Sequence, residues 1–262
     1  MNSKINSKID LKIQNGYTIE TGSLIDESVK TFKKTFLISG VAFILLAIFS
    51  VIIYGTIFVL VYGLSDFTST MTEFQASQSS AVGMLSTVII ATVTSAFFAP
   101  ITAGFIHANH LAKNNQEIGI NVFFDFYKSK FFKDLFLSYL IIGITGGLLS
   151  SSLTLINLQI LTYFVQFLIS IATVFTIPLI IYGEQSYENA LTKSFKLFFK
   201  QPVLIFVALL LAIIGVLIGI IALCIGIIFT FPYYYSMVYA IYNQAIGFEE
   251  KSIIDEIGQE EF

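Results

Sequence analysis

The chain has 262 residues, 56% of them hydrophobic and 12% charged, and its mean hydropathy is +0.83. A water-soluble domain of this size could not hide that much apolar surface in one core, so the composition predicts an integral membrane protein. The net charge is −3, and the single cysteine, Cys224, excludes a disulfide framework or a thiolate metal cluster within one chain.

Residues 1–22 are expected to form a cytoplasmic tail. The first thirty residues carry charges throughout, and the first long apolar run begins only near Leu37. A cleavable signal peptide would place a short apolar stretch earlier, so we expect the first membrane span to remain in the protein.

Residues 23 to 36 predict an amphipathic helix. Ser23 is a candidate N-cap, and Asp26 follows it at the reciprocal-capping distance. Apolar and charged positions then separate onto opposite helical faces. The apolar face holds Ile25, Val29, Phe32 and Phe36, and the other face holds Asp26, Lys30, Lys33 and Lys34.

Four intervals contain no charged residue: 35–65, 74–106, 135–183 and 201–248. About 20 apolar residues in a helix cross the ~30 Å hydrocarbon core of a bilayer, so the first two intervals hold one span each and the last two hold a pair each. We therefore predict six transmembrane helices, at 37–63, 83–110, 135–153, 159–182, 203–223 and 226–247. The segments "SSSLTLINLQ" and "CIGI" are the expected turns within the two pairs.

The amphipathic segment recurs twice. Asn121 and Ser186 correspond to Ser23, and seven residues after each of the three comes a lysine followed by a hydroxyl residue: Lys30-Thr31, Lys128-Ser129 and Lys193-Ser194. The last copy sets Tyr187, Leu191, Phe195 and Phe198 against Glu188, Lys193, Lys196 and Lys200, and Pro202 predicts a break before the next span. The sequence thus predicts an all-α bundle of three repeats, each an interfacial helix plus a helical hairpin. The repeats cover 23–112, 121–182 and 186–247 within a membrane domain of 23–248, followed by an acidic cytoplasmic tail at 249–262.

Lysine placement predicts the orientation. Six lysines precede the first span, four lie between spans two and three, three lie between spans four and five, and one follows span six. Short cytoplasmic segments carry the basic excess, so both termini are expected to be cytoplasmic. The absence of Arg and the wealth of Ile, Phe and Asn indicate an AT-rich bacterial source, and hence the bacterial inner membrane.

The three basic segments are expected to lie in the membrane interface. Their aromatic rings can sink ~5 to 10 Å into the headgroup boundary, and each lysine near an anionic leaflet contributes about 1 kcal/mol. The alternative is a solvated charged face on a helix that packs against the bundle. The candidate headgroup contacts are Lys30, Lys33, Lys128, Lys193 and Lys196.

Polar residues inside the spans offer a second kind of site. Thr162, Gln166, Ser170 and Thr173 form a stripe on span four, and such stripes either join helices or line a wet cavity. On span six, Tyr235, Tyr239 and Tyr242 share a face whose deeper hydroxyls need partners. The candidate pocket is therefore Tyr235, Tyr239, Tyr242, Gln166 and Ser170, against the alternative that these residues only pack.

Other features of the spans have structural interpretations. Pro100, Pro178 and Pro232 predict kinks in the even-numbered spans, and the pairs Gly143/Gly147 and Gly215/Gly219 predict close helix packing. His107 and His110 could share a metal with Glu117 or Asp125, or could be interfacial polar residues. We expect neither a metal nor a cofactor.

Three segments carry a resemblance to a known family: "FFAPITAGFIHANHLAK", "FFDFYKSKFFKDLFLSYL" and "IPLIIYGEQSYENALTKSFKLFFK". With the lysine helix before the first span, they resemble uncharacterised bacterial six-helix membrane proteins similar to the membrane domain of glycerophosphodiester phosphodiesterases. The resemblance covers about residues 20–248 and implies an architecture. In that family the phosphodiesterase chemistry belongs to a separate barrel domain, so no catalytic residue is carried over.

Two functions follow as hypotheses. The first is a non-enzymatic membrane protein that interacts with lipid, or scaffolds a protein complex, through its basic surface helices. The second is a permease or facilitator for a neutral or lipid-like substrate that uses the polar faces of spans two, four and six. An enzyme is not expected, since no nucleophile–base pair, metal set or phosphate-binding glycine loop is found. Membrane lipids are the expected partners, and nucleic acid is not.

Overall fold

The computed structural model describes residues 2–63, 67–77, 80–221 and 226–248, and in these ranges all regular structure is helical, which confirms the all-α prediction. The elements are α1 (Asn2–Asn15), α2 (Thr21–Tyr62), α3 (Phe67–Ser77), α4 (Ala81–Lys113), the 3₁₀ turns η1 (Ile120–Phe123) and η2 (Asp125–Tyr127), α5 (Phe132–Leu155), α6 (Gln159–Ala172), α7 (Thr176–Ile181), α8 (Tyr187–Lys200), α9 (Pro202–Ile221), α10 (Gly226–Thr230) and α11 (Tyr233–Ala245).

Five helical stretches are long and apolar enough to cross a membrane, which fits a multi-pass membrane protein. They are Thr21–Val61, Ala81–Lys113, Phe132–Leu155, Gln159–Ile181 and Pro202–Ile220. The sixth expected span, 226–247, is divided between α10 and α11 at Phe231-Pro232. At 1.5 Å per residue neither piece crosses a bilayer alone.

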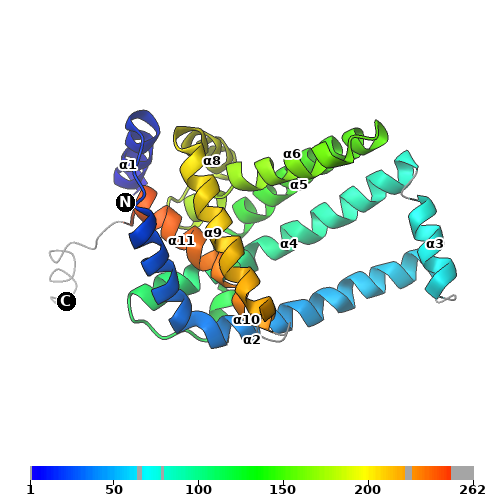
Figure 1. Ribbon diagram of the computed structural model, residues 1–262, viewed down its shortest axis with the longest axis horizontal. Coiled ribbons are helices and arrows are strands. Elements are labelled where there is room, and N and C mark those ends of the chain that lie inside the picture. Colours follow the sequence, from blue (N-terminus) through cyan, green and yellow to red (C-terminus); the bar gives the residue numbers. More distant parts are fainter. Residues whose placement is uncertain (1, 64–66, 78–79, 222–225, 249–262) are drawn as a thin grey trace.

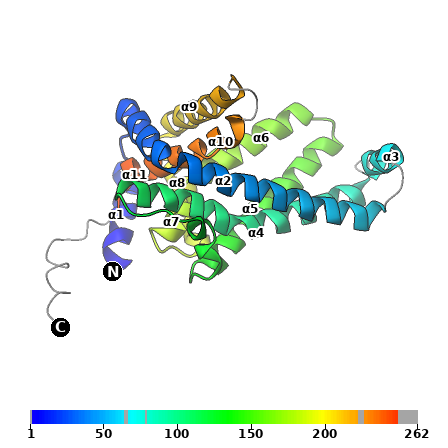
Figure 2. The ribbon, with the colours of Figure 1, turned by 90° about the horizontal axis from the view of Figure 1, so that it is seen from below.

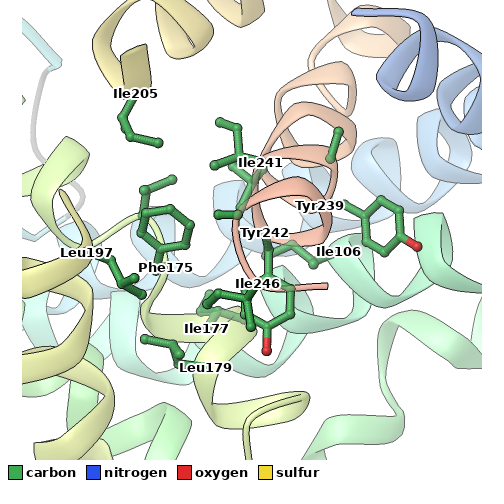
Figure 3. Packing of buried hydrophobic residues seen from close by; sticks show 14 of the residues in the cluster. Ile106, Phe175, Ile177, Leu179, Leu197, Ile205, Tyr239, Ile241, Tyr242 and Ile246 are labelled. Atoms are coloured by element: carbon green, nitrogen blue, oxygen red, sulfur yellow. The ribbon is translucent and has the colours of Figure 1, made fainter. Parts of the chain in front are cut away.

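The burial of apolar side chains differs between the two ends of the molecule. In Figure 1 the hairpins α2–α4 and α5–α6 extend to the right, away from α1, α8 and α11 at the left. Large apolar side chains on the extended helices are open, including Leu60 at 79%, Val82 at 79% and Ile160 at 88% exposure. At the other end the packed core includes Phe175, Tyr239 and Tyr242, each at most 1% exposed (Figure 3). Lipid would cover the exposed apolar surface, which is far more than isolated surface residues provide.

The prolines interrupt two of the three even spans. A three-residue break separates α6 from α7 just before Pro178, and α10 ends before Pro232, whereas Pro100 lies inside the continuous α4. A proline lacks the N–H for a helical hydrogen bond, so neighbouring groups must satisfy the freed backbone. Ser194 of α8 does this at the first break: its hydroxyl donates to the Ala172 carbonyl over 2.8 Å and accepts from the Phe175 N–H over 3.2 Å.

The glycine pairs mark close helix approaches, as expected. A Cβ built at Gly147 would lie 2.5 Å from Val88, so α5 and α4 pack at a distance that only glycine allows there. A Cβ at Gly215 would lie 2.3 Å from the Tyr233 ring, which brings α9 against α11.

The N-terminal 22 residues are not a plain tail. Residues 2–15 form α1, which buries Ile5 and Ile9 in the core at 5% and 0% exposure. Tyr17, which follows α1, donates a hydrogen bond of 2.9 Å from its hydroxyl to the Leu197 carbonyl of α8. The segment "KINSKIDLKI" within α1 has an amphipathic pattern, and this helix is not among the predicted elements.

The first surface helix and the first span form one helix. α2 begins at Thr21, two residues before the expected N-cap, and the Ser23 hydroxyl donates to the Glu20 carbonyl instead of capping. Figures 1 and 2 show that its first part runs at an angle to the rest. Phe32 and Phe36 pack against Tyr233 and Phe229 at ring distances of 5.3 and 5.5 Å. The aromatic face of this helix therefore covers the bundle, and Lys30 and Lys33 on its charged face are exposed.

The prediction of a surface helix at 121–129 is wrong. The segment forms η1 and η2, and it buries Phe123 and Phe126 at 0% and 8% exposure. A Cβ at Gly104 would lie 2.5 Å from the Cα of Phe123, so the backbone itself packs on α4. This tertiary contact overrides the helical pattern, and the expected threefold repeat is broken at its second copy.

The third surface helix agrees with the sequence. α8 occupies Tyr187–Lys200, and Pro202 is the first residue of α9. Ser186 has the extended backbone of an N-cap without a side-chain capping bond, and the Tyr187 N–H donates to Asp134 of α5 over 3.0 Å. The segment 156–158 turns α5 into α6 as expected. Of the expected turn at 224–227, residues 224 and 225 lie outside the described residues, and 226 and 227 begin α10.

Candidate functional site

A polar cavity of about 200 Å³ lies among α4, α5, α6, α7 and α11. Side chains from these five helices meet there because Gly143, opposite Thr92, lets α5 approach α4 closely, while the break before Pro178 redirects the chain from α6 into α7. Its polar lining consists of Thr102, Tyr139, Gln166, Ser170, Thr173, Tyr234 and Tyr235.

Several of these polar groups already have protein partners. The Gln166 amide donates to the Gly146 carbonyl over 3.0 Å and to the Ser150 hydroxyl over 2.5 Å, which joins α6 to α5. The Thr102 and Thr173 hydroxyls donate to the Phe98 and Ile169 carbonyls of their own helices over 3.4 and 2.8 Å. The polar stripe of α6 therefore both joins helices and lines a cavity.

Among the described residues, those that line the cavity include no lysine, histidine or acidic side chain. A hydroxyl offers one donor and two acceptor lone pairs, so a cluster of hydroxyls can bind neutral donors and acceptors alike. It offers nothing to neutralise a full charge, and burying an unpaired charge is costly.

An apolar groove of about 360 Å³ adjoins the cavity and shares Ser170, Tyr234 and Tyr235 with it. Its remaining walls come from α6, α9 and the residue before Pro232. They are Phe167, Ile171, Leu209, Ile213, Val216, Leu217 and Phe231.

The structure brings together three of the five predicted pocket residues. Gln166, Ser170 and Tyr235 line the cavity, but Tyr239 and Tyr242 do not. Figure 3 shows Tyr239 and Tyr242 leaving α11 in different directions, with Tyr242 near Ile177 and Leu179 of α7. The three tyrosines were grouped by sequence spacing, but only Tyr235 lines the cavity.

Tyr239 and Tyr242 belong to an aromatic cluster beyond the cavity. Phe248 packs against both rings, at 5.3 and 5.6 Å between centroids, and against His110 at 4.5 Å. The Tyr239 hydroxyl lies 3.4 Å from Nδ1 of His110, and the Tyr182 hydroxyl lies 3.5 Å from Nδ1 of His107. The two histidine rings stack at 5.9 Å. In the described part of the chain no group of three His, Cys, Asp or Glu side chains surrounds them.

The predicted headgroup lysines divide into two kinds. Lys30, Lys33, Lys128 and Lys196 are exposed. Lys193 is not free: its ammonium group pairs with Asp10 of α1 at 2.8 Å, and its side chain is 17% exposed. The sequence pattern of α8 alone could not show this, because the partner carboxylate lies 183 positions earlier in the chain.

A charged groove follows the first part of α2. Glu27 accepts from Lys113 of α4 and from Asn243 of α11, both over 2.7 Å. Lys34 donates to the Ala112 carbonyl over 2.9 Å and to the Asn115 side chain over 2.6 Å. These contacts hold α2 against the ends of α4 and α11. Lys34 and Lys113 therefore make contacts within the protein.

Two cavity residues escaped the sequence prediction. Tyr139 was missed because it is an isolated tyrosine in the apolar span of α5, and Tyr234 because its neighbour Tyr235 fitted the helical spacing better. A signal did exist for both: a tyrosine hydroxyl deep in a span needs a hydrogen-bond partner.

Comparisons with known protein families, curated proteins and solved structures found no match to this chain. The resemblance to the membrane domain of glycerophosphodiester phosphodiesterases therefore stays an expectation.

Proposed function

We propose that this protein is a non-enzymatic, lipid-binding protein of the bacterial cytoplasmic membrane, with both termini in the cytoplasm. In this proposal α10 and α11 together form a sixth, proline-broken span. The exposed apolar helices lie in the bilayer, and the lysine-rich end contacts anionic headgroups at the cytoplasmic surface.

The observation that carries the proposal is the set of exposed lysines on a helical bundle whose apolar side chains are also exposed. Lys30, Lys33, Lys128 and Lys196 are exposed. On α8, Phe195 and Phe199 are 39% and 69% exposed beside Lys196, which is the combination of rings and ammonium groups that suits a membrane interface.

The expected strength of this interaction is substantial. At about 1 kcal/mol for each lysine near an anionic leaflet, four lysines contribute ~4 kcal/mol. Because every 1.4 kcal/mol is tenfold in affinity, even half of that value would enrich anionic lipid about thirtyfold around the protein.

Replacing Lys30, Lys33, Lys128 and Lys196 with Gln tests the proposal. We expect the ratio of phosphatidylglycerol to phosphatidylethanolamine that co-purifies with the protein to fall by at least about threefold, because the charge that attracts the anionic lipid is gone. Mass spectrometry of the extracted lipids measures the ratio. The matched control replaces the same lysines with Arg, which keeps the charge and should keep the ratio. An unchanged ratio in the Gln variant would overturn the headgroup role.

The same preparation addresses the scaffold form of the proposal. A stoichiometric protein that co-purifies with the Arg variant and is lost from the Gln variant, with the lipid ratio unchanged, would replace lipid by a protein complex as the partner of the lysine face.

A second candidate function is favoured by the uncharged cavity. A facilitator for a neutral or lipid-like substrate would use the polar residues of α4, α6 and α11 that meet there. In reconstituted vesicles such a protein speeds the transbilayer movement of a fluorescent diacylglycerol, and a rate equal to that of protein-free vesicles would exclude it.

A further inference from the structure

The polar cavity and the apolar groove share one wall. Ser170, Tyr234 and Tyr235 line both, so the two spaces meet at these side chains. We infer that they form a single binding site for a neutral amphiphile, which places a hydroxyl or ester head in the cavity and its hydrocarbon chain in the groove.

The head end is suited to a small uncharged polar group. The cavity of about 200 Å³ is rimmed by hydroxyls on three different helices, those of Thr102, Tyr139 and Tyr234. Because each hydroxyl can rotate between donating and accepting, the cluster can exchange an internal hydrogen bond for one to a ligand without leaving a buried group unsatisfied.

The absence of charge in this lining selects against phospholipids. The polar contacts around the cavity come from hydroxyls and one amide, and a phosphate would lose its water without gaining a cation. The basic side chains that could hold a phosphate, such as Lys128 and Lys196, are exposed to the outside of the protein. Two lipid chemistries are therefore bound at two places: anionic headgroups at the lysines and a neutral head in the cavity.

The chain end opens sideways to the bilayer. The groove is lined by aliphatic and aromatic side chains of α6 and α9, and its outer residues Ile213 and Leu217 are 38% and 47% exposed. In a membrane this exposed side faces acyl chains. An amphiphile can thus enter from the lipid between α6 and α9 while its own chain stays in an apolar environment.

This inference shares with the proposed function only the premise that the chain spans a membrane. It deepens the second candidate function by naming a ligand class, and it does not depend on the lysines. Photo-crosslinking therefore distinguishes a failure of this inference from a failure of the proposed headgroup role of the lysines.

The test is photo-crosslinking of the full chain in vesicles of phosphatidylethanolamine and phosphatidylglycerol. The probe is 1-oleoylglycerol that carries a diazirine in its chain and an alkyne for detection. An otherwise identical lysophosphatidic acid is the charged comparison. We expect saturable labelling of peptides from α6, α9 and α11 by the neutral probe, competed by unlabelled 1-oleoylglycerol, and at least about tenfold weaker labelling of these peptides by the charged probe.

Two neighbouring substitutions provide a matched pair. Ile213→Trp places a large ring in the groove and should reduce the labelling by about fivefold or more, because it occupies the chain position. Ile214→Trp makes the same change at a residue that is 50% exposed and does not line the groove, and it should leave the labelling unchanged. Equal melting temperatures of the two variants in detergent show that both are folded.

A second pair of substitutions tests the head end of the site. Tyr234→Phe removes one cavity hydroxyl and should weaken competition by 1-oleoylglycerol, whereas Tyr163→Phe removes a hydroxyl from a side chain that is 77% exposed and should not. The inference is overturned if both probes label the same peptides equally, if labelling does not saturate, or if Ile213→Trp and Ile214→Trp behave alike. Lysine variants that lose phosphatidylglycerol but keep this labelling would leave the inference standing.

Discussion

At the residue scale, Gly104 shows how one missing side chain shapes the packed end of the molecule. The backbone of Phe123 crosses α4 at this glycine, and a Cβ there would lie 2.5 Å from the Phe123 Cα. The contact buries Phe123 and closes the loop between α4 and α5 onto the helix.

Gly104→Ala is therefore expected to destabilise the protein. The added methyl group meets backbone atoms that cannot rotate away, and such overpacking costs about 1–3 kcal/mol. Thermal unfolding in detergent measures the change.

Gly55→Ala on α2 is the control for this substitution, since a Cβ at Gly55 has no atom within 4 Å. Alanine favours a helix over glycine by about 1 kcal/mol, so this variant should be as stable as the parent or more so. A Gly104→Ala variant as stable as the Gly55→Ala variant would show that the loop does not pack on α4 in this way.

Single residues also show which features the sequence could predict and which it could not. The spacing of Gln166 and Ser170 on a helix predicted a shared face, and both line the cavity. The partner of Lys193 and the position of Tyr239 outside the cavity lining depend on elements that fold against them, so helical periodicity could not reveal either.

At the element scale, α1 is an additional helix held over α8. Asp10 pairs with Lys193, the Lys200 ammonium group donates to the Gln14 carbonyl over 3.2 Å, and the Tyr17 hydroxyl donates to the Leu197 carbonyl over 2.9 Å. Tyr17 is 3% exposed, and this burial raises the pKa of its hydroxyl.

Alkaline pH should therefore release α1. With a folded-state pKa above the unfolded value of about 10, Tyr17 stabilises the docked helix fully below about pH 10, and this contribution is lost as the pH rises toward the folded pKa. A spin label on α1 at Leu11, which is 53% exposed, reports docking through its mobility.

Tyr17→Phe isolates the tyrosine, since every other side chain is the same in both proteins. At neutral pH the Phe variant should be the more mobile, because it lacks a hydrogen bond worth about 1 kcal/mol. At alkaline pH the order should reverse, because Phe cannot ionise. Mobility curves that stay parallel would contradict the role of Tyr17.

Elements differed in how well the sequence predicted them. α8 was predicted because its periodicity continues up to Pro202, where a proline suits the first turn of the next helix. Residues 121–130 carry a similar pattern of rings and lysines, yet Phe123 and Phe126 are buried and η1 and η2 pack on α4. The same local pattern thus gives a helix or 3₁₀ turns according to what it can pack against.

At the scale of the whole molecule, one end is packed and the apolar side chains of the other end are exposed. This division accounts for the positions of the two proposed sites, the exposed lysines and the cavity with its groove. The charge-free intervals of the sequence predicted six spans, and five of them correspond to helices of membrane-spanning length, because hydropathy is a local property. The cavity depends on five helices meeting around a proline break, and only the tertiary structure shows this.

The claim on which the whole account depends is that the lysine-rich end and the α3 end lie on opposite sides of a membrane. Single cysteines at Lys196 and Glu73, in a chain with Cys224 replaced by Ser, can be labelled with a membrane-impermeant maleimide in right-side-out and inside-out vesicles. We predict that Glu73→Cys reacts only in right-side-out vesicles and Lys196→Cys only in inside-out vesicles. Reaction of both positions from the same side would contradict the account.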